Sequence, residues 1–364
     1  MQSGVVQNID AGAVRDDAAL ELVHSDVLRF FPDLVRDLGG DPDALLRRAG
    51  LDPNLFALRK PLLGYRAIAL VLELAAEELA CPDFGMRLAK RQGGGGVFGP
   101  IGVVMRHSRT FGEGLDYVRR HIHAHSLAAR LRFEPHEERG TFVSFEILLD
   151  RLPSARQIME QALLLAHLNA IDITGARARA REVHFRHEPL SPRKTYRANF
   201  GCELHFGSAA DGLAFAERDM QAHVLEPDTD IYEIATAFID TNFPRVSPPM
   251  HARVRGLIMR YLGVEDCTNE RIADELCLHP RTLHRRLRAE GKSFEAIKDE
   301  VRRDMALRYL KETDLPLTCV AEKLGYAETS VLSRSCFRWY GAPPSRVRSR
   351  MRAAASLRDG DAFG

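Results

Sequence analysis

The chain has 364 residues and 45% of them are hydrophobic, which is enough to bury the cores of two or three domains. Its six cysteines are scattered without a Cys-x-x-Cys pair, which argues against a disulfide framework or a zinc knuckle and favours the reducing cytoplasm. The first 20 residues lack a basic start followed by an apolar run, and three glutamates interrupt the apolar stretch 67–80. We therefore expect a cytoplasmic protein with neither an export signal nor a membrane span.

The net charge of +1 hides an asymmetry along the chain. Residues 268–350 carry 17 Lys and Arg against 12 Asp and Glu, a net charge of +5, whereas the rest of the chain carries 34 against 38, a net charge of −4. A polyanionic partner would therefore bind the C-terminal part. Because 44 of the 51 basic residues are arginines, a single arginine carries little information.

Residues 20–220 are expected to form one α+β domain. Apolar residues three and four apart predict short helices over 26–40, 41–51 and 65–79. Alternating or continuous apolar residues predict strands over 126–135 and 140–150, joined by a hairpin turn, and further strands over 180–187 and 211–219. A helix is predicted over 155–171, between the two pairs of strands.

Residues 221–249 are expected to be a linker, with a helix over 228–243 and a proline-bounded break over 244–249. From 250 to 350 strand signals disappear and helix starts recur, which predicts an all-α domain. Thr268 is placed to cap one helix, and His279 and Pro280 open a second. Ser293 or Phe294 leads a long third helix that ends near residue 313.

The C-terminal domain contains an internal repeat. Segments 271–291 and 319–341 share one plan: a short amphipathic helix containing an alanine, a leucine at its end, a three-residue turn, a longer helix and a closing glycine. Two helix-turn-helix units joined by the long helix are the simplest explanation. In such a unit the second helix lies in the major groove of DNA, where the base edges carry a unique pattern of donors and acceptors.

The second helix of the first unit has an apolar side and a cationic side. Leu283 and Leu287 lie one turn apart and face the core. Arginine suits bidentate contact with guanine, a threonine or histidine supplies a shorter donor or acceptor, and the remaining cations suit phosphates. We predict DNA contacts by Arg281, Thr282, His284, Arg285 and Arg288, with Arg286 and Lys292 as further candidates for phosphate.

In the second unit, Leu332 and Cys336 form the inward pair. We predict DNA contacts by Thr329, Val331, Ser333, Arg334 and Arg338, with Val331 able to touch a thymine methyl group. The alternative for both helices is a solvated face in an arginine-rich protein. The duplication of the unit favours DNA recognition over that alternative.

Residues 268–348 resemble the DNA-binding domain of the AraC/XylS family of bacterial transcription regulators. The family's C-terminal signature stands here as Gly325-Tyr326, Ser330, Leu332, Ser333-Arg334, Arg338-Trp339-Tyr340-Gly341, Pro344 and Arg348. The resemblance implies that Arg281, His284 and Arg285 take the base-contacting places of the first recognition helix, and that Thr329, Val331 and Arg334 take those of the second.

Two positions depart from the family pattern. Cys336 stands where the family usually has an aromatic residue, and Phe337 where it usually has Lys or Arg. The second departure removes one cation that would face phosphate. The domain fold is not expected to change.

Residues 20–220 look similar to the ligand-binding domain of the arabinose-binding-domain type, in the subgroup that includes ornithine-utilisation regulators. Segment 98–126, with its Gly-x-x-Gly followed by a threonine and a short helix, carries this looser similarity. The similarity implies a sensor and dimerisation role without naming the ligand.

Three other patterns in this domain are weighed against ordinary structural roles. His121, His123 and His125 have alternate spacing that would suit a metal on a strand, but the segment is typical of a helix end, so no metal site is expected. The glycines of 90–102 follow a helix and lack the Gly-Lys-Ser/Thr ending of a phosphate loop. Cys81 and Cys202 do not lie in a nucleophile elbow, so no catalytic residue is expected.

The combined prediction is a transcription regulator, not an enzyme, with an α+β sensor domain and an all-α domain of two helix-turn-helix units. Its expected partners are promoter DNA, RNA polymerase, a small-molecule effector and a second copy of the chain, with no cofactor. By family habit it would be an activator. The alternatives are a ligand-independent DNA-binding dimer, a repressor, or an enzyme-like domain fused to a DNA-binding tail.

Overall fold

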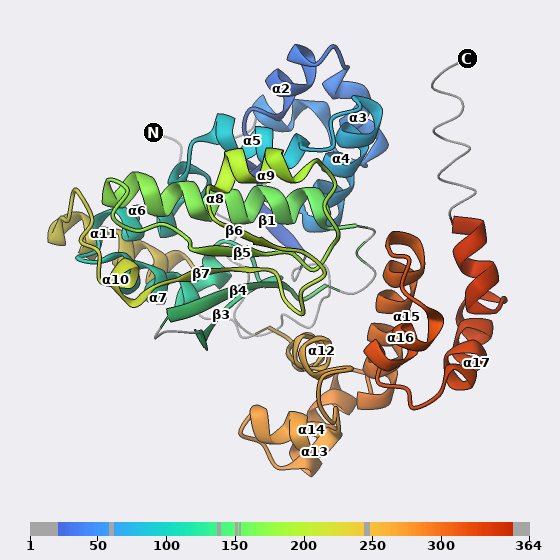
Figure 1. Cartoon of the computed structure of the whole chain (residues 1–364). Helices are drawn as coiled ribbons and strands as arrows, with labels where there is room; N and C mark the ends of the chain where they lie inside the picture. Colours follow the sequence, from blue (N-terminus) through green and yellow to red (C-terminus); the bar gives the residue numbers. More distant parts are fainter. Residues whose placement is uncertain are drawn as a thin grey trace. The chain divides into compact units, whose positions relative to one another are not determined.

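The computed structural model of the chain describes residues 21–57, 62–136, 140–149, 152, 154–243 and 248–351. The chain divides into two compact units, residues 1–248 (unit 1) and residues 249–364 (unit 2). Unit 1 combines helices and strands and unit 2 is helical within its described residues, as the sequence predicts (Figure 1).

The main sheet of unit 1 has five strands in the order β3-β4-β7-β5-β6. They are β3 (Ala129–His136), β4 (Gly140–Ile147), β7 (Gly212–Phe215), β5 (Glu182–His184) and β6 (Glu203–His205). All neighbours are antiparallel except β5 and β6, which are parallel. The predicted hairpin is confirmed as the β3–β4 pair, although most of its turn lies outside the described residues. A separate two-stranded sheet pairs β1 (Leu22–His24) with β2 (Leu62–Gly64).

The two faces of the main sheet differ in chemistry. One row of paired residues crosses all five strands as Phe133, Val143, Leu213, Val183 and Leu204, and the last four are buried. The next row lies on the opposite face, because successive side chains of a strand point to opposite faces. It contains three carboxylates, one alanine and one phenylalanine: Glu134, Phe142, Ala214, Glu182 and Glu203. This second face carries the polar residues of β5 and β6.

Helix α8 (Arg156–Thr174) is the central helix of unit 1 and confirms the helix predicted over 155–171. It packs against β7 and against α4 (Tyr65–Glu78), α5 (Phe84–Gln92) and α9 (Arg193–Phe200) (Figure 1). Helix α5 approaches α8 closely at Gly85, where an added Cβ would lie 2.1 Å from the Gln157 carbonyl oxygen. The Gly85 amide instead donates to Gln157 Oε1 at 2.7 Å, which fixes α5 on α8.

The remaining helices of unit 1 come before and after α8 in the chain. They are η1 (Ser25–Leu28), α2 (Phe31–Asp37), α3 (Pro42–Arg48), η2 (Pro53–Ala57), η3 (Gly95–Phe98), α6 (Pro100–His107), α7 (Phe111–His121), η4 (Ile122–Ala124), α10 (Glu217–Met220) and α11 (Thr229–Asn242). Helix α11 falls in the segment that was expected to be a linker. It packs against α6 within unit 1, and Ala235 and Ile239 on its inner side are buried. The predicted proline-bounded break lies mostly outside the described residues.

Unit 2 contains six helices whose bounds are fully described. They are α12 (Met250–Tyr261), α13 (Asn269–Glu275), α14 (Pro280–Ala289), α15 (Phe294–Glu312), α16 (Leu317–Lys323) and α17 (Thr329–Tyr340), and residues 344–351 are also helical. Buried side chains from all six form one hydrophobic core. The α13–α14 and α16–α17 pairs are the two predicted repeats, and α15 is the predicted long helix between them. None of the helices in the described residues combines the length and the hydrophobicity of a membrane span.

Candidate nucleic-acid interface

The first repeat begins and turns as its sequence predicts. Thr268 Oγ1 caps α13 by accepting from the Arg271 amide at 3.2 Å. His279 caps α14, since its Nδ1 accepts from the Arg281 amide at 3.2 Å, and Pro280 occupies the first position of that helix. The path of the chain into α14 is therefore fixed locally.

Helix α14 presents its arginines to solvent. Leu283 and Leu287 are fully buried in the core of unit 2, as predicted. Thr282 is half-buried, whereas the cationic and imidazole side chains predicted to face DNA are exposed: Arg281, His284, Arg285 and Arg288, together with Arg286. The structure does not test their contacts with DNA, which stay predictions.

Helix α17 has the same division. Leu332 and Cys336 are fully buried, as predicted. Arg334 and Arg338 are exposed, and the smaller candidates Thr329, Val331 and Ser333 are half-buried. Arg338 forms an ion pair with Asp299 of α15, so a contact with phosphate would compete with this pair.

The two repeats are equivalent residue by residue up to the turn. The Leu278 amide donates to the Ala273 carbonyl at 2.9 Å, and the Tyr326 amide donates to the Ala321 carbonyl at the same distance. The residue before each of these amides has a positive φ: 52° at Cys277 and 64° at Gly325. The α16–α17 turn is then one residue longer, because α14 begins after His279 and α17 after Glu328.

After the turn, each recognition-helix position in the first repeat has its counterpart 49 residues later. This offset pairs buried Leu283 with buried Leu332 and buried Leu287 with buried Cys336. It also pairs Arg285 with Arg334, and both are exposed. The same arginine position is thus presented twice by one unit.

Residues of the α17 signature hold the second repeat on α15. Trp339 Nε1 donates to Asp299 Oδ2 at 2.9 Å, and the Tyr340 hydroxyl donates to the Arg303 carbonyl at 2.5 Å. From α15, Arg302 Nε donates to the Leu324 carbonyl at 2.9 Å and so satisfies the C-terminus of α16. These contacts fix both helices of the repeat on the helix that links it to the first.

Helix α12 ties the first repeat to the same linking helix. It packs against α13, α14 and α15. Arg255 on α12 is buried and donates to Asp304 of α15 at 2.7 Å. The Met250 amide at the start of α12 donates to Glu290 Oε1 at 2.7 Å, which anchors it to the end of α14.

The two departures from the family pattern have a structural explanation. The small Cys336 thiol fills the inward position, and burial raises its pKa to about 11, so it is an inert core group. Phe337, in contrast, is 61% exposed. It occupies the counterpart of Arg288, so α17 presents an apolar ring where α14 presents a cation.

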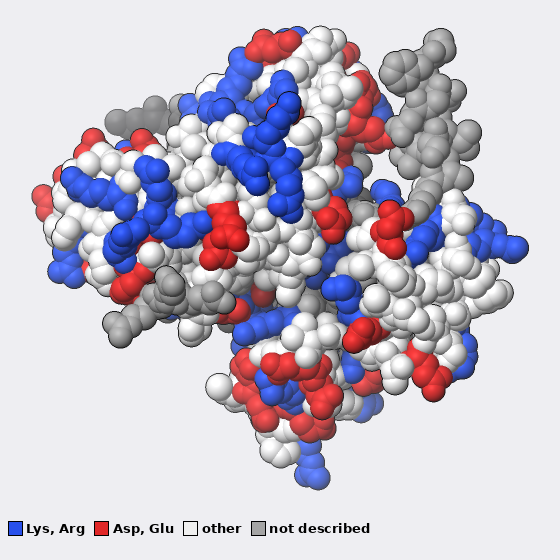
Figure 2. Space-filling view, in the orientation of Figure 1, with Lys and Arg blue, Asp and Glu red and all other residues white. Residues whose placement is uncertain are grey.

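The outward arginines of the two helices are available to an anionic partner. Within the described residues, Arg281, Arg285, Arg288 and Arg334 form no ion pair with a carboxylate. Over the face drawn in Figure 2, cations and anions are interspersed on both units, so charge density alone does not mark an interface. The position of the arginines on the repeated helix is the more specific signal.

Unit 1 has a polar groove of about 770 Å³. It is lined by residues of four helices (α6, α7, α10 and α11), of strand β4 and of the adjoining loops: His107, Ser108, Arg109, Thr110, Gly112, Glu113, Asp116, Arg120, Thr141, Glu217, Met220, Gln221, Thr229 and Tyr232. Burial opposes ionisation of Asp116, but hydrogen bonds and charges from Arg119 and Arg120 outweigh it and hold the pKa of that carboxyl below its usual value. Much of the lining comes from segment 98–126, which carried the similarity to a ligand-binding domain.

The three closely spaced histidines lie at the end of α7, where the rings of His121 and His123 are 5.9 Å apart. His121 ends α7 and its Nδ1 lies 2.9 Å from the Tyr117 carbonyl, and His123 Nε2 lies 3.1 Å from the Phe243 carbonyl. His125 is half-buried, and desolvation by its surroundings lowers its pKa to about 4. The glycine segment before α6 packs closely on α8, because a Cβ at Gly95 would lie 2.3 Å from Asn169 Oδ1.

Sequence reasoning missed a cluster on the polar face of the main sheet. His136, Glu182 and His184 place one ligand-type atom each within 4.8 Å of one another. The spacing of Glu182 and His184 on a predicted strand was the available signal, since it places both side chains on one face. Nothing local in the sequence brings His136 to them across 46 residues.

Comparison with known proteins agrees with these features. Residues 39–224 match the family model described as the arabinose-binding domain of AraC transcription regulator, N-terminal, and residues 272–350 match a helix-turn-helix domain model. The HTH-type transcriptional regulator VirS of Mycobacterium tuberculosis is 35% identical over 329 residues, which cover 90% of this chain and 96% of VirS. The ornithine utilization regulator of Pseudomonas aeruginosa is 25% identical over 87% of this chain and 93% of its own length. The crystal structure of the transcriptional regulator CdpR from Pseudomonas aeruginosa covers 85% of this chain and 96% of its own, with 19% identity and a TM-score of 0.42.

Proposed function

Because the chain belongs to the AraC family of transcription regulators, we propose that α14 and α17 bind two successive major grooves of a promoter. The observation that carries this proposal is the repeated exposed arginine, Arg285 and Arg334, each on a helix whose inner side is buried in one core. The linking helix α15 has 19 residues and is therefore roughly 28 Å long. This length is comparable with the turn of a DNA duplex, about 34 Å, which separates successive major grooves.

The residues proposed to contact DNA divide by chemistry. Arg281, Arg285 and Arg334 suit guanine O6 and N7, and Val331 suits a thymine methyl group. Thr282, His284, Thr329 and Ser333 supply shorter donors or acceptors, while Arg288 and Arg338 suit phosphates. One chain would then recognise an asymmetric site, because the outward positions of the two helices carry different side chains at every counterpart pair except Arg285 and Arg334.

The polar groove of unit 1 is the proposed effector site. Its volume of about 770 Å³ suits a small molecule, and its lining of hydroxyl, carboxylate and guanidinium groups suits a polar one. A ligand can switch the protein only if it binds two conformational states with unequal affinity. Because the groove is lined by α7, α10 and α11, bound effector would favour one arrangement of these helices.

A second copy of the chain is the proposed partner for α11. This helix exposes Ile231, Ile234 and Phe238, which are 39%, 70% and 48% exposed and recur three and four residues apart. Such a stripe is the contact pattern of a helix that packs against another helix. Exchange of Ile234 for Glu should convert dimers to monomers in sedimentation velocity, whereas Glu233→Gln on a neighbouring face should leave them intact.

The remaining parts of the proposal follow from family membership. As a regulator of promoters, the protein would act in the cytoplasm of a bacterium. As an activator, it would also contact RNA polymerase. The curated relatives are transcriptional regulators, which favours this function over an enzyme fused to a DNA-binding tail. Repression and ligand-independent binding are the alternatives to be separated by experiment.

Chromatin immunoprecipitation of the full chain in its host tests the proposed function. We expect narrow enrichment at a small set of promoters, and loss of that enrichment in a variant carrying both Arg285→Ala and Arg334→Ala. A matched variant, Arg197→Gln, changes an exposed arginine on α9 and should retain every site. Equal enrichment of all three proteins, or enrichment without promoter preference, would count against the proposal.

A thermal-shift screen of the full chain against amino acids, sugars and fatty acids tests the effector site. A true effector should raise Tm in the wild type and in Arg197→Gln, but less in Arg120→Gln, which alters the groove. Stabilisation by none of these classes would favour the ligand-independent alternative.

A further inference from the structure

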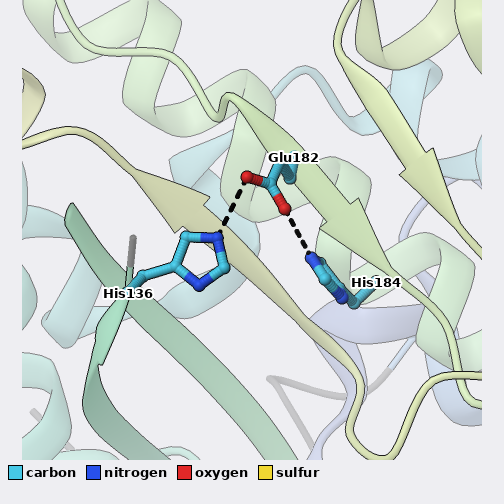
Figure 3. A group of neighbouring side chains, drawn as sticks. All are labelled: His136, Glu182 and His184. Carbon is cyan, nitrogen blue, oxygen red and sulfur yellow. Dashed lines mark hydrogen bonds and ion pairs between the residues drawn. The ribbon is translucent and has the colours of Figure 1, made fainter. Parts of the chain in front are cut away.

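The polar face of the main sheet in unit 1 gathers imidazoles around one carboxylate. His136 at the end of β3 and Glu182 and His184 on β5 point toward one another (Figure 3). His136 Nε2 lies 3.0 Å from Glu182 Oε1, and His184 Nε2 lies 2.9 Å from Glu182 Oε2. His205 on β6 adds a third imidazole, with Nε2 at 3.3 Å from Glu182 Oε2.

The strand pairing explains how residues distant in sequence meet. Glu182 pairs with Ala214 of β7, and His136 pairs with Gly140 of β4. These small residues stand on the two strands between β3 and β5 and leave room for the longer side chains. The Phe142 ring of β4 lies on the same face and packs against His136 and His184, with centroids 6.0 and 5.0 Å away. The parallel β5–β6 pair sets His184 opposite His205, and their rings stack with centroids 4.3 Å apart.

We propose that His136, Glu182 and His184 bind a divalent transition-metal ion of the zinc type. Two imidazoles and one carboxylate are a common set of three protein ligands for such ions, and nitrogen donors disfavour magnesium and calcium. The three ligand-type atoms lie within 4.8 Å of one another. Around an ion with bonds of about 2.1 Å in tetrahedral geometry, ligand atoms lie about 3.4 Å apart, so small side-chain movements would complete the site.

Two further contacts support metal binding over a simple hydrogen-bonded pair. Ser208 Oγ lies 3.4 Å from His184 Nδ1, which leaves Nε2 directed at Glu182. A ligand histidine commonly has such an outer partner on its other nitrogen. His205 stacks on His184 and its Nε2 also faces Glu182, so three imidazoles surround one carboxylate, which is more than a hydrogen-bonded pair requires.

Bound metal would join the β3–β4 hairpin to the β5–β6 pair across the sheet. Since metal binds the folded site and not the unfolded chain, it would raise the stability of unit 1. The proposal concerns unit 1 alone and does not depend on DNA binding.

Cobalt titration of the untagged, metal-stripped full chain tests the site. We expect one Co²⁺ per chain, followed by its absorption in the visible region, displacement by Zn²⁺, and a rise in Tm when Zn²⁺ is added. Glu182→Gln keeps the size of the side chain and one acceptor oxygen but removes the charge, and it should weaken Zn²⁺ binding at least about tenfold. His136→Asn should do the same, which guards against a folding defect in one variant.

His123→Gln is the matched control, because it removes a histidine elsewhere in unit 1 and should leave the titration unchanged. Circular dichroism checks that each variant is folded. Equal affinity and stoichiometry in the wild type and in folded Glu182→Gln would overturn the proposal, as would the absence of any micromolar site in the wild type.

Discussion

Arg285 and Arg334 occupy counterpart positions on α14 and α17, each two residues after a fully buried leucine, Leu283 or Leu332. The buried leucine sets the rotation of its helix, so each arginine points out of the core in the same register. Both are exposed and neither forms an ion pair within the part of the chain that the structure describes. A single unit therefore exposes two guanidinium groups at equivalent positions of its two repeats.

Loss of either arginine should reduce specific binding. Arg285→Ala or Arg334→Ala should each cost about 1–3 kcal/mol on the specific site and little on random DNA, because a bidentate contact with guanine is lost. Fluorescence anisotropy with both DNAs at fixed salt measures the difference. Equal losses of affinity on specific and random DNA would show that the arginine contacts phosphate and not a base.

Restoring a cation at Phe337 should strengthen binding regardless of sequence. Phe337 is 61% exposed at the counterpart of Arg288, so Phe337→Lys would place a charge near phosphate without disturbing the core. Affinity should rise on both specific and random DNA, and the slope of log K against log salt should steepen by about 0.9, the value for one added phosphate contact. Phe337→Gln is the neutral control, and the same slope in both variants would contradict this role.

The turn of the first repeat stores backbone strain at Cys277. Its φ of 52° lies in the left-handed region, where its counterpart is Gly325 with φ 64°. Cys277→Gly should raise the free energy of unfolding of unit 2 by roughly 0.5–1 kcal/mol, because relief of the left-handed conformation exceeds the entropic cost of glycine.

Urea unfolding followed by Trp339 fluorescence measures this change, since Trp339 is the only tryptophan and lies in unit 2. The converse variant, Gly325→Ala, should lower stability by about 1–2 kcal/mol. Stabilisation by Gly325→Ala, or destabilisation by Cys277→Gly, would show that strain at this position is not important.

Glu160 should make unit 1 less stable as pH rises. It is fully buried on α8, where the Tyr196 hydroxyl donates to it and His187 Nε2 lies 3.7 Å away, and burial raises its pKa to about 8. The ordinary value is 4.5, so between about pH 4.5 and 8 the folded state binds more protons than the unfolded state and stability falls as pH increases.

Glu160→Gln removes this titration and should flatten the dependence by about 1 kcal/mol per pH unit across the interval. Urea unfolding followed by circular dichroism at several pH values compares the two proteins. Glu188→Gln, at an exposed position, should keep the wild-type slope. The same slope in Glu160→Gln and wild type would mean that Glu160 is ionised in the folded state at neutral pH.

Local sequence patterns were sufficient for most of unit 2. The cap at Thr268, the helix starts at His279-Pro280 and at Ser293 or Phe294, and the buried pairs of α14 and α17 follow from short-range rules, and all are confirmed, with Ser293 as the cap of α15. The structure was required to identify Arg285 and Arg334 as counterparts. The second turn is one residue longer than the first, so the spacing between equivalent residues changes from 48 before the turn to 49 after it.

Long-range pairing limited the prediction of unit 1. The β3–β4 hairpin and α8 were predictable from alternation and helical periodicity. The order of the five strands was not, since β7 lies between β4 and β5 although it comes last in sequence. The approach of His136 to Glu182 follows from that order. The cluster of His136, Glu182 and His184 therefore could not be predicted from the local spacing of residues.

Methylation interference on the bound promoter tests the central claim most directly. If α14 and α17 enter successive major grooves, methylated guanine N7 should interfere with binding in two clusters about one helical turn apart, on one face of the duplex. Arg285→Ala should erase one cluster and Arg334→Ala the other. A single cluster, or interference unchanged in both variants, would contradict the claim that one chain reads two grooves through these counterpart arginines.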